Sequence, residues 1–131
     1  VLSVHSVLSE ETQGLFNKSV FTKMKQSAIF INTSRGGVHN EEDLIEALQT
    51  GVIWGAGLDV TNPEPMLSNN PLLNMPNAAV LPHIGSATEE ARTGMARIAA
   101  ENIIELYKTG KMIYCVNPEV LKDNWRQKFE N

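Results

Sequence analysis

Uninterrupted apolar runs of strand length constrain the fold of this chain more than any other feature. The clearest is AIFIN at 28–32, which is rich in β-branched residues, and VIWGAGLDV at 52–60 and AAVLP at 78–82 are similar. Runs of this kind are typical of strands buried on both faces of a parallel sheet. The segment VLSVH at 1–5 alternates apolar with small or polar residues and predicts one more short strand.

Two helical patterns separate the three predicted strands that come first along the chain, at 1–5, 28–32 and 52–60. Residues 40–51 predict a helix with Asn40 as its N-cap, acidic residues in its first turn and Gly51 just past its end. Residues 17–26 predict another helix, with Asn17 as its N-cap. Its apolar face would consist of Val20, Phe21 and Met24.

A long helix is predicted over 86–110. Ser86 and Glu89 fit a capping box at its start, and Gly110 is expected to end it. Its apolar stripe would consist of Met95, Ile98, Ala99, Ile103 and Leu106.

The order strand, helix, strand, helix, strand, strand, helix predicts an α/β fold with a parallel sheet and right-handed crossovers. The chain contains no internal repeat. After the last helix, residues 111–131 have no strong period, although Trp125 and Phe129 indicate that this tail docks on another surface.

Composition excludes several classes of protein. The net charge of the 131 residues is −4 and Lys and Arg form no basic patch, so we expect binding to neither nucleic acid nor an anionic membrane. No apolar stretch is long enough to cross a bilayer. A single cysteine, Cys115, fits a reducing cytoplasm. The three histidines do not recur at ligand spacing, so we predict no metal site.

Arg35, Glu64 and His83 each follow a different predicted strand. In open α/β sheets, ligands bind outside the carboxyl ends of the strands. We therefore expect the three side chains to converge on one edge of the sheet. Two glycines after Arg35 would let the backbone approach a ligand closely.

Each of these residues also has a simpler interpretation. Arg35 could form a surface ion pair, Glu64 could be a solvated loop residue and His83 could be a satisfied core histidine. In combination they suit a particular chemistry, because an arginine fork matches a carboxylate. A histidine paired with a carboxylate has a fixed tautomer and can donate a proton near neutral pH. The set therefore suits a 2-keto or 2-hydroxy acid as substrate.

Other features carry less chemistry. GAGLD at 55–59 is not interpreted as a dinucleotide fingerprint, because no helix opens at its second glycine. We expect its glycines, which have no side chains, to let a neighbouring segment pack closely against the strand. Trp54 is expected in the core or an interface, and His39 on a loop surface. Ser34 has no histidine at nucleophile spacing, so a serine hydrolase has little support.

Three motifs in this order resemble the D-isomer-specific 2-hydroxyacid dehydrogenases: INTSRGGVHNEEDLIEAL, GAGLDVTNPEP and VLPHIGSAT. The resemblance runs over residues 1–110 and is closest to the glyoxylate reductase/hydroxypyruvate reductase branch. It implies the second half of a Rossmann-type doubly wound parallel sheet, followed by a long helix and a C-terminal tail.

The resemblance implies roles for individual residues. Arg35 in SRG matches the arginine that binds the substrate carboxylate, and His83 in PHIGS matches the histidine that exchanges a proton with the substrate oxygen. Glu64 in PEP matches the acid that pairs with this histidine. Asp59 and Gly85 match positions at the nicotinamide end of the cofactor. The other cofactor-binding positions would be His5, Thr33 and Ser34, together with Arg35 and His83.

The implied activity is reduction of glyoxylate or hydroxypyruvate to a 2-hydroxy acid with NADP or NAD as the cofactor. We expect residues 1–87 to be the C-terminal part of the NAD(P)-binding domain, and residues 88–131 to be a linking helix and tail that pack on a substrate domain. The G-x-G-x-x-G half of the family fold has no counterpart in this sequence. We therefore expect a fragment that is inactive by itself.

Two alternatives remain open. The chain could belong to an NAD(H)-sensing, corepressor-like binding protein, or to another D-2-hydroxyacid dehydrogenase that acts on D-lactate or phosphoglycerate. The resemblance further implies a small 2-keto or 2-hydroxy acid as the partner, a homodimer and a cytoplasmic location.

Overall fold

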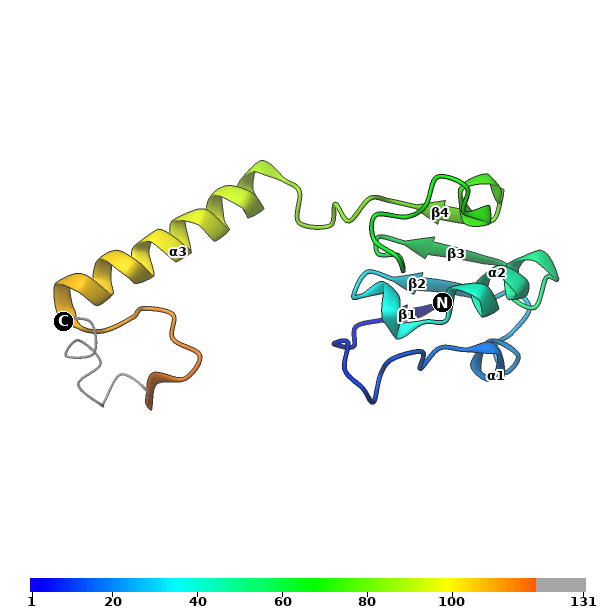
Figure 1. Ribbon diagram of the computed structural model, residues 1–131, viewed down its shortest axis with the longest axis horizontal. Helices are drawn as coiled ribbons and strands as arrows, with labels where there is room; N and C mark the ends of the chain where they lie inside the picture. The colour runs from blue at the N-terminus through cyan, green and yellow to red at the C-terminus, as the bar shows by residue number, and fades with distance from the viewer. Residues whose placement is uncertain (120–131) are drawn as a thin grey trace. The chain divides into compact units, whose positions relative to one another are not determined.

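The computed structural model describes residues 1–119 (Figure 1). The chain divides into two compact units, one covering Val1–Gly85 and one that begins at Ser86. The first unit holds the four strands and the two shorter α-helices, and the second holds the long helix. The division at residues 87 and 88 into parts of two domains stays a prediction.

One parallel sheet forms the centre of the first unit (Figure 1). Phe30 in the second strand pairs with Leu2 on one side and with Ala56 on the other, and every adjacent pair of strands is parallel. The α/β fold expected from the apolar runs is confirmed, and the carboxyl ends of all four strands lie at the same edge. In spatial order the strands are β1 (Leu2–Val4), β2 (Ile29–Asn32), β3 (Gly55–Leu58) and β4 (Ala78–Val80).

Two short helices flank the sheet, each begun by the predicted asparagine. In α2 (Glu41–Gln49) the Asn40 side chain accepts the N–H of Asp43, which confirms Asn40 as the N-cap. In α1 (Lys18–Phe21) the Asn17 side chain accepts the N–H of Ser19. The α1 helix is shorter than expected, because the residues after it continue in turns whose N–H groups bond three residues back rather than four.

The core of the first unit is aromatic at its centre. The ring of Phe30 is fully buried and meets Phe21 edge-on at 5.3 Å and Phe16 at 5.4 Å between ring centroids. Aliphatic side chains of α2, of β3 and of the turn between them also belong to this core. They include Leu44, Leu48, Ile53 and Leu58.

The glycines of GAGLD are strand residues, as expected. A β-carbon on Gly57 would lie 2.9 Å from Cδ1 of Ile31 in the neighbouring strand, and one on Gly55 would lie 3.1 Å from the carbonyl oxygen of Asn77. These glycines therefore admit close packing, as expected, and both lie inside β3 rather than at the start of a helix. Trp54, which directly precedes β3, is 65% exposed, so of its two expected positions the core is wrong and an interface stays a prediction.

The second unit contains the long helix α3 (Glu89–Thr109). The helix ends on Gly110 in the left-handed conformation, as expected, with φ of 77°. Its start differs from the prediction: Thr88 is the N-cap and accepts the N–H of Ala91, whereas the predicted capping box used Ser86.

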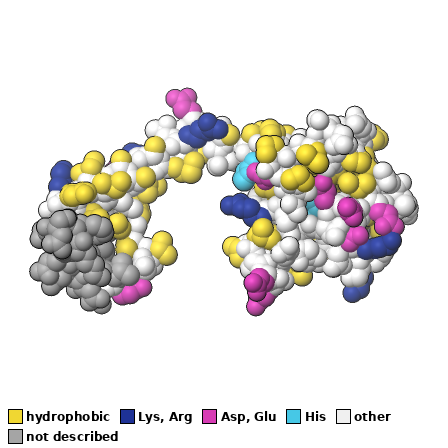
Figure 2. Space-filling model, in the orientation of Figure 1, with side chains coloured by type: hydrophobic (Ala, Val, Ile, Leu, Met, Phe, Trp, Pro, Cys, Tyr) yellow, Lys and Arg dark blue, Asp and Glu magenta, His cyan; other side chains and the backbone are white. Residues whose placement is uncertain are grey.

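No residue of α3 is buried, and hydrophobic side chains lie along it (Figure 2). Met95, Ile98 and Ile103 of the predicted apolar stripe are all exposed. The chain after the helix turns back onto it, because Asn102 exchanges two hydrogen bonds with the backbone of Tyr114. The docking predicted for Trp125 and Phe129 falls outside the described residues. Every helix among residues 1–119 is too short or too polar to cross a membrane.

Candidate active site

The candidate site lies at the carboxyl edge of the sheet. β2 leads into the turn that carries Arg35, β3 leads through Asp59 to Glu64, and β4 leads to His83. A chain segment that leaves a parallel strand at this edge cannot continue the ladder, so its polar groups are available for a ligand. The structure therefore brings the predicted residues to one edge, as the strand order required.

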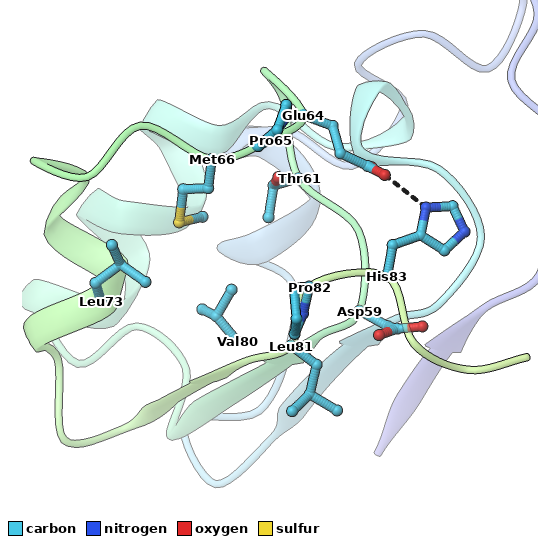
Figure 3. A pocket seen from close by; sticks show the side chains of 10 residues that line it. All are labelled: Asp59, Thr61, Glu64, Pro65, Met66, Leu73, Val80, Leu81, Pro82 and His83. Atoms are coloured by element: carbon cyan, nitrogen blue, oxygen red, sulfur yellow. Dashed lines mark hydrogen bonds and ion pairs between the residues drawn. The ribbon is translucent and has the colours of Figure 1, made fainter. Parts of the chain in front are cut away.

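His83 and Glu64 form a direct pair (Figure 3). Nδ1 of His83 lies 2.5 Å from Oε1 of Glu64, and the two side chains are 43% and 40% exposed. The hydrogen bond from His83 is the main cause that holds the pKa of the Glu64 carboxyl below its ordinary value. The nearby charges of His83 and Arg35 act in the same direction, and partial desolvation opposes them. Since Nδ1 faces the carboxylate, Nε2 is the ring atom that can exchange a proton with a ligand.

The backbone at His83 is in the left-handed region, with φ of 55°. A non-glycine residue there costs about 1 kcal/mol and needs support from its surroundings. Asp59 supplies that support: its two carboxylate oxygens accept the N–H groups of Ile84 and Gly85, both at 2.8 Å. These two hydrogen bonds fix the backbone next to His83 and so set the direction in which its side chain points.

Asp59 leaves no room for a side chain at Gly85. A β-carbon on Gly85 would lie 2.9 Å from Oδ2 of Asp59. The space is therefore filled by the carboxylate that binds the Gly85 N–H. Asp59 itself is 6% exposed, and contact of either residue with a nicotinamide stays a prediction.

Arg35 is exposed, and its Nη1 donates to the carbonyl oxygen of Ser34 at 2.7 Å. The expectation that both following glycines admit a ligand is wrong for Gly36. A β-carbon there would lie 1.9 Å from the carbonyl oxygen of Thr61, so the glycine lets two loops of the protein touch. The contact joins the Arg35 turn to the segment that leads to Glu64.

Two buried residues behind Arg35 were missed as parts of the site. Asn32 is fully buried at the end of β2, and Nδ1 of His39 lies 2.9 Å from its Nδ2. The expected surface position of His39 is wrong, because its side chain is 2% exposed and its ring stacks edge-on against Phe30. Burial penalises the charged imidazole and lowers the pKa of His39 to about 4. The one signal in the sequence was an amide as the last residue of an apolar strand run.

The proposed cofactor positions lie at the ends of β1 and β2. His5 and Thr33 are exposed, whereas Ser34 is half-buried and donates to Asn32. Such ring, hydroxyl and amide groups fit the ribose and carboxamide of a nicotinamide nucleotide. They offer no phosphate cradle, because protein atoms already fill the β-carbon positions at Gly36 and Gly85. The residues at these strand ends therefore fit the nicotinamide end of NAD or NADP, and their contact with it stays a prediction.

A cavity of about 540 Å³ opens beside the His83–Glu64 pair (Figure 3), which is in the usual range for small-ligand sites. One wall is polar and includes Asp59 and Thr61, and the other is apolar and includes Met66, Leu73 and Val80. Among residues 1–119, no group of three or more His, Cys, Asp and Glu side chains could hold a metal ion.

The fold is a parallel α/β fold, a class of protein in which ligands bind outside the carboxyl ends of the strands. A sequence model described as D-isomer specific 2-hydroxyacid dehydrogenase, NAD binding domain, matches residues 1–85. The chain therefore belongs to the family of D-isomer specific 2-hydroxyacid dehydrogenases. The resemblance inferred from the three motifs is confirmed.

Two curated relatives are similar over most of this chain. Glyoxylate/hydroxypyruvate reductase B of Klebsiella pneumoniae is 53% identical over 113 residues, which are 86% of this chain and 35% of that protein. Human glyoxylate reductase/hydroxypyruvate reductase is 54% identical over 97 residues, which are 74% of this chain and 30% of that protein. The chain thus spans 35% and 30% of the lengths of these relatives.

A solved structure supports the same fold. The crystal structure of a glyoxylate reductase from Paecilomyes thermophila superposes with a TM-score of 0.79 at 33% identity, over 90% of this chain and 35% of that chain. The Rossmann-type arrangement followed by a long helix is therefore confirmed. The match to an NAD-binding domain agrees with the expectation of NAD or NADP.

Proposed function

We propose that this chain carries the proton-transfer residues of a reductase that converts glyoxylate or hydroxypyruvate to the 2-hydroxy acid with NADPH or NADH. The observation that carries the proposal is the His83–Glu64 pair, held at the carboxyl edge of the sheet beside Arg35. The names of the two curated relatives support the substrate class.

In this mechanism Arg35 binds the carboxylate of the keto acid through its guanidinium fork, which orients the carbonyl group. Nε2 of His83 hydrogen-bonds to the carbonyl oxygen, and Glu64 stabilises the protonated ring through Nδ1. NADPH or NADH, when bound by the residues at the nicotinamide end of the site, would supply the hydride to C2. His83 then gives its proton to the developing alkoxide, which completes the hydroxyl group.

General acid catalysis of this kind contributes about 10²–10⁴-fold to the rate. The contribution depends on where His83 points, so Asp59 would act indirectly through the Ile84 and Gly85 N–H groups. Asp59, Gly85, His5, Thr33 and Ser34 are proposed to line the nicotinamide end.

The corepressor alternative is not favoured, because the relatives above are named as reductases. Reduction of another 2-keto acid, as in a D-lactate or phosphoglycerate dehydrogenase, would use the same three residues. A homodimer and a cytoplasmic location stay predictions from the resemblance.

The test is a chimera in which the aligned 113 residues of the Klebsiella relative are replaced by those of this chain. NADPH and NADH oxidation are followed with glyoxylate, hydroxypyruvate and pyruvate. We expect turnover of the first two, and loss of about 10²–10⁴-fold in kcat/KM for His83→Ala. Lys25→Gln, in an exposed turn, is the matched control.

A folded chimera that is inactive with all three keto acids would contradict the proposal, as would a His83→Ala variant with unchanged kcat/KM. Preference for pyruvate would favour the lactate dehydrogenase alternative. The isolated 131-residue chain is expected to be inactive, and steady cofactor oxidation by it with hydroxypyruvate would contradict the expectation of a fragment.

A further inference from the structure

The carboxamide of Asn32 uses all of its hydrogen-bonding capacity on the turn that carries Arg35 and on the ring of His39. Its Oδ1 accepts the backbone N–H of Ser34 at 3.0 Å and the Ser34 hydroxyl at 2.9 Å. Its Nδ2 donates to the carbonyl oxygen of Arg35 at 3.0 Å and lies 2.9 Å from Nδ1 of His39. One buried side chain therefore holds the turn from two sides.

His39 is the fixed end of this arrangement. Its backbone N–H donates to Gly36, and the flanking residues are tied to Phe16: the Phe16 N–H donates to Val38, and the Asn40 N–H donates to Phe16. The ring of His39 also packs against Phe30, with 5.7 Å between centroids. The segment that carries His39 is thus anchored by Phe16 and Phe30 in addition to its bonds with the Arg35 turn.

A histidine is a costly choice for this core position. Since Nδ1 accepts from Asn32, the ring proton must be on Nε2, and within residues 1–119 that buried nitrogen has no hydrogen-bond partner. A phenylalanine would have a similar shape without an unpaired buried N–H group. Packing alone therefore does not explain His39, whereas its acceptor for Asn32 does.

From this geometry we infer that Asn32 and His39 are positioning residues that hold the Arg35 turn, and with it the guanidinium, in the orientation that binds a substrate carboxylate. The inference rests on the proposed function for the role of Arg35. The connection is short: Asn32 bonds to the Arg35 carbonyl oxygen and to Ser34, and the Arg35 guanidinium bonds to the Ser34 carbonyl oxygen. A fork that binds a carboxylate with two hydrogen bonds depends on such fixed geometry.

The first test needs no catalysis and uses the 131-residue chain itself. Amide hydrogen exchange is measured for His39→Phe, which removes the acceptor, and for His39→Asn, whose side-chain oxygen can replace Nδ1. We expect the Ser34 amide to exchange about fivefold faster in His39→Phe, as loss of one hydrogen bond predicts. In His39→Asn it should stay near the parent rate. Amides of β2 and β3 serve as the internal control.

The second test uses the chimera described above. We expect His39→Phe to raise KM for glyoxylate about fivefold with kcat changed less than twofold, and His39→Asn to restore KM. The thermal midpoint of His39→Phe at pH 7 should stay close to that of the parent, because the variant removes the unpaired Nε2–H of His39 but leaves one N–H of the Asn32 side chain unpaired instead. A purely structural role would lower the midpoint and would leave KM unchanged.

Three results would overturn the inference: an unchanged Ser34 amide, an unchanged KM, or exchange that rises equally throughout the sheet. Failure of the proposed function is a separate outcome, since it appears as a His83→Ala chimera with full activity. In that case a faster Ser34 amide in His39→Phe still shows anchoring of the turn, and its role in carboxylate binding is withdrawn.

Discussion

A β-carbon on Gly36 would lie 1.9 Å from the carbonyl oxygen of Thr61. The two residues follow different strands, so this contact sets the spacing between the turn that presents Arg35 and the loop that presents Glu64. Thr61 also braces that loop internally, because its hydroxyl donates to the carbonyl oxygen of Pro63 at 2.8 Å. The spacing of the two charged side chains is therefore a property of backbone packing.

Gly36→Ala is expected to lower the free energy of unfolding of the chain by about 3 kcal/mol, because a methyl group cannot fit against backbone that is held on both sides. Denaturant unfolding measures the change. The matched control is Gly94→Ala in α3, where nothing lies within 4 Å of the added carbon and alanine favours the helix. Equal stability of the two variants would show that the loops separate easily.

Replacing His83 should raise the pKa of the Glu64 carboxyl toward its ordinary value of 4.5, because the hydrogen bond from His83 is the largest cause of the lowered pKa. His83→Asn keeps a donor without a positive charge and should leave most of the lowering in place. His83→Ala should remove it. NMR titration of the Glu64 carboxyl carbon measures all three, and an identical pKa in the parent and His83→Ala would contradict the pair in solution.

The sign of the associated pH dependence follows from that direction. The folded-state pKa of Glu64 is depressed, so its pair with His83 contributes to the free energy of unfolding at any pH above the ordinary pKa. This contribution is lost as the pH falls through the lowered pKa of the folded state.

His39 should make the chain less stable in mild acid. Its pKa of about 4 in the folded state lies below the ordinary 6.5, so the unfolded chain binds a proton first as the pH falls. The free energy of unfolding should therefore decrease by about 3 kcal/mol between pH 6.5 and pH 4 from this residue alone. His39→Phe should be flatter than the parent by that amount in urea unfolding at a series of pH values. If the free energy of unfolding of the parent and of His39→Phe changed with pH in the same way, His39 would be accessible to water.

Glu41 is expected to hold the loop that carries Glu64, because it binds a residue on each side of Glu64. Its carboxylate accepts the Asn70 side chain at 2.5 Å and the Asn62 N–H at 3.3 Å. Glu41→Ala should lower the free energy of unfolding by about 2 kcal/mol and speed exchange of the Asn62 amide. Glu42→Ala is the control, because this exposed acid shares the first turn of α2 and its helix dipole. If both variants lowered the free energy of unfolding equally, Glu41 would contribute only through the helix dipole and not through its bonds to the loop.

Most elements could be predicted from local patterns, and the errors have a common cause. The apolar runs located β2, β3 and β4, and Asn40 marked the start of α2. The long helix was placed correctly, but its cap is Thr88, since serine and threonine are both favoured N-cap residues and only the backbone conformation selects one of Ser86 and Thr88. His39 was expected on the surface but is buried, and the core alternative for Trp54 is wrong, because hydrophobicity scales treat a histidine as exposed and a tryptophan as buried.

The sequence by itself determined the parallel α/β fold and the placing of Arg35, Glu64 and His83 at one edge, since strand periodicity and strand order are readable from neighbours along the chain. Only the tertiary structure decided that Glu64 reaches Nδ1 of His83 and that Gly36 meets Thr61. It also decided that Asn32 and His39 lie buried beneath the turn. These relationships join segments that are distant in the sequence, and their energies depend on burial and geometry that no local pattern contains.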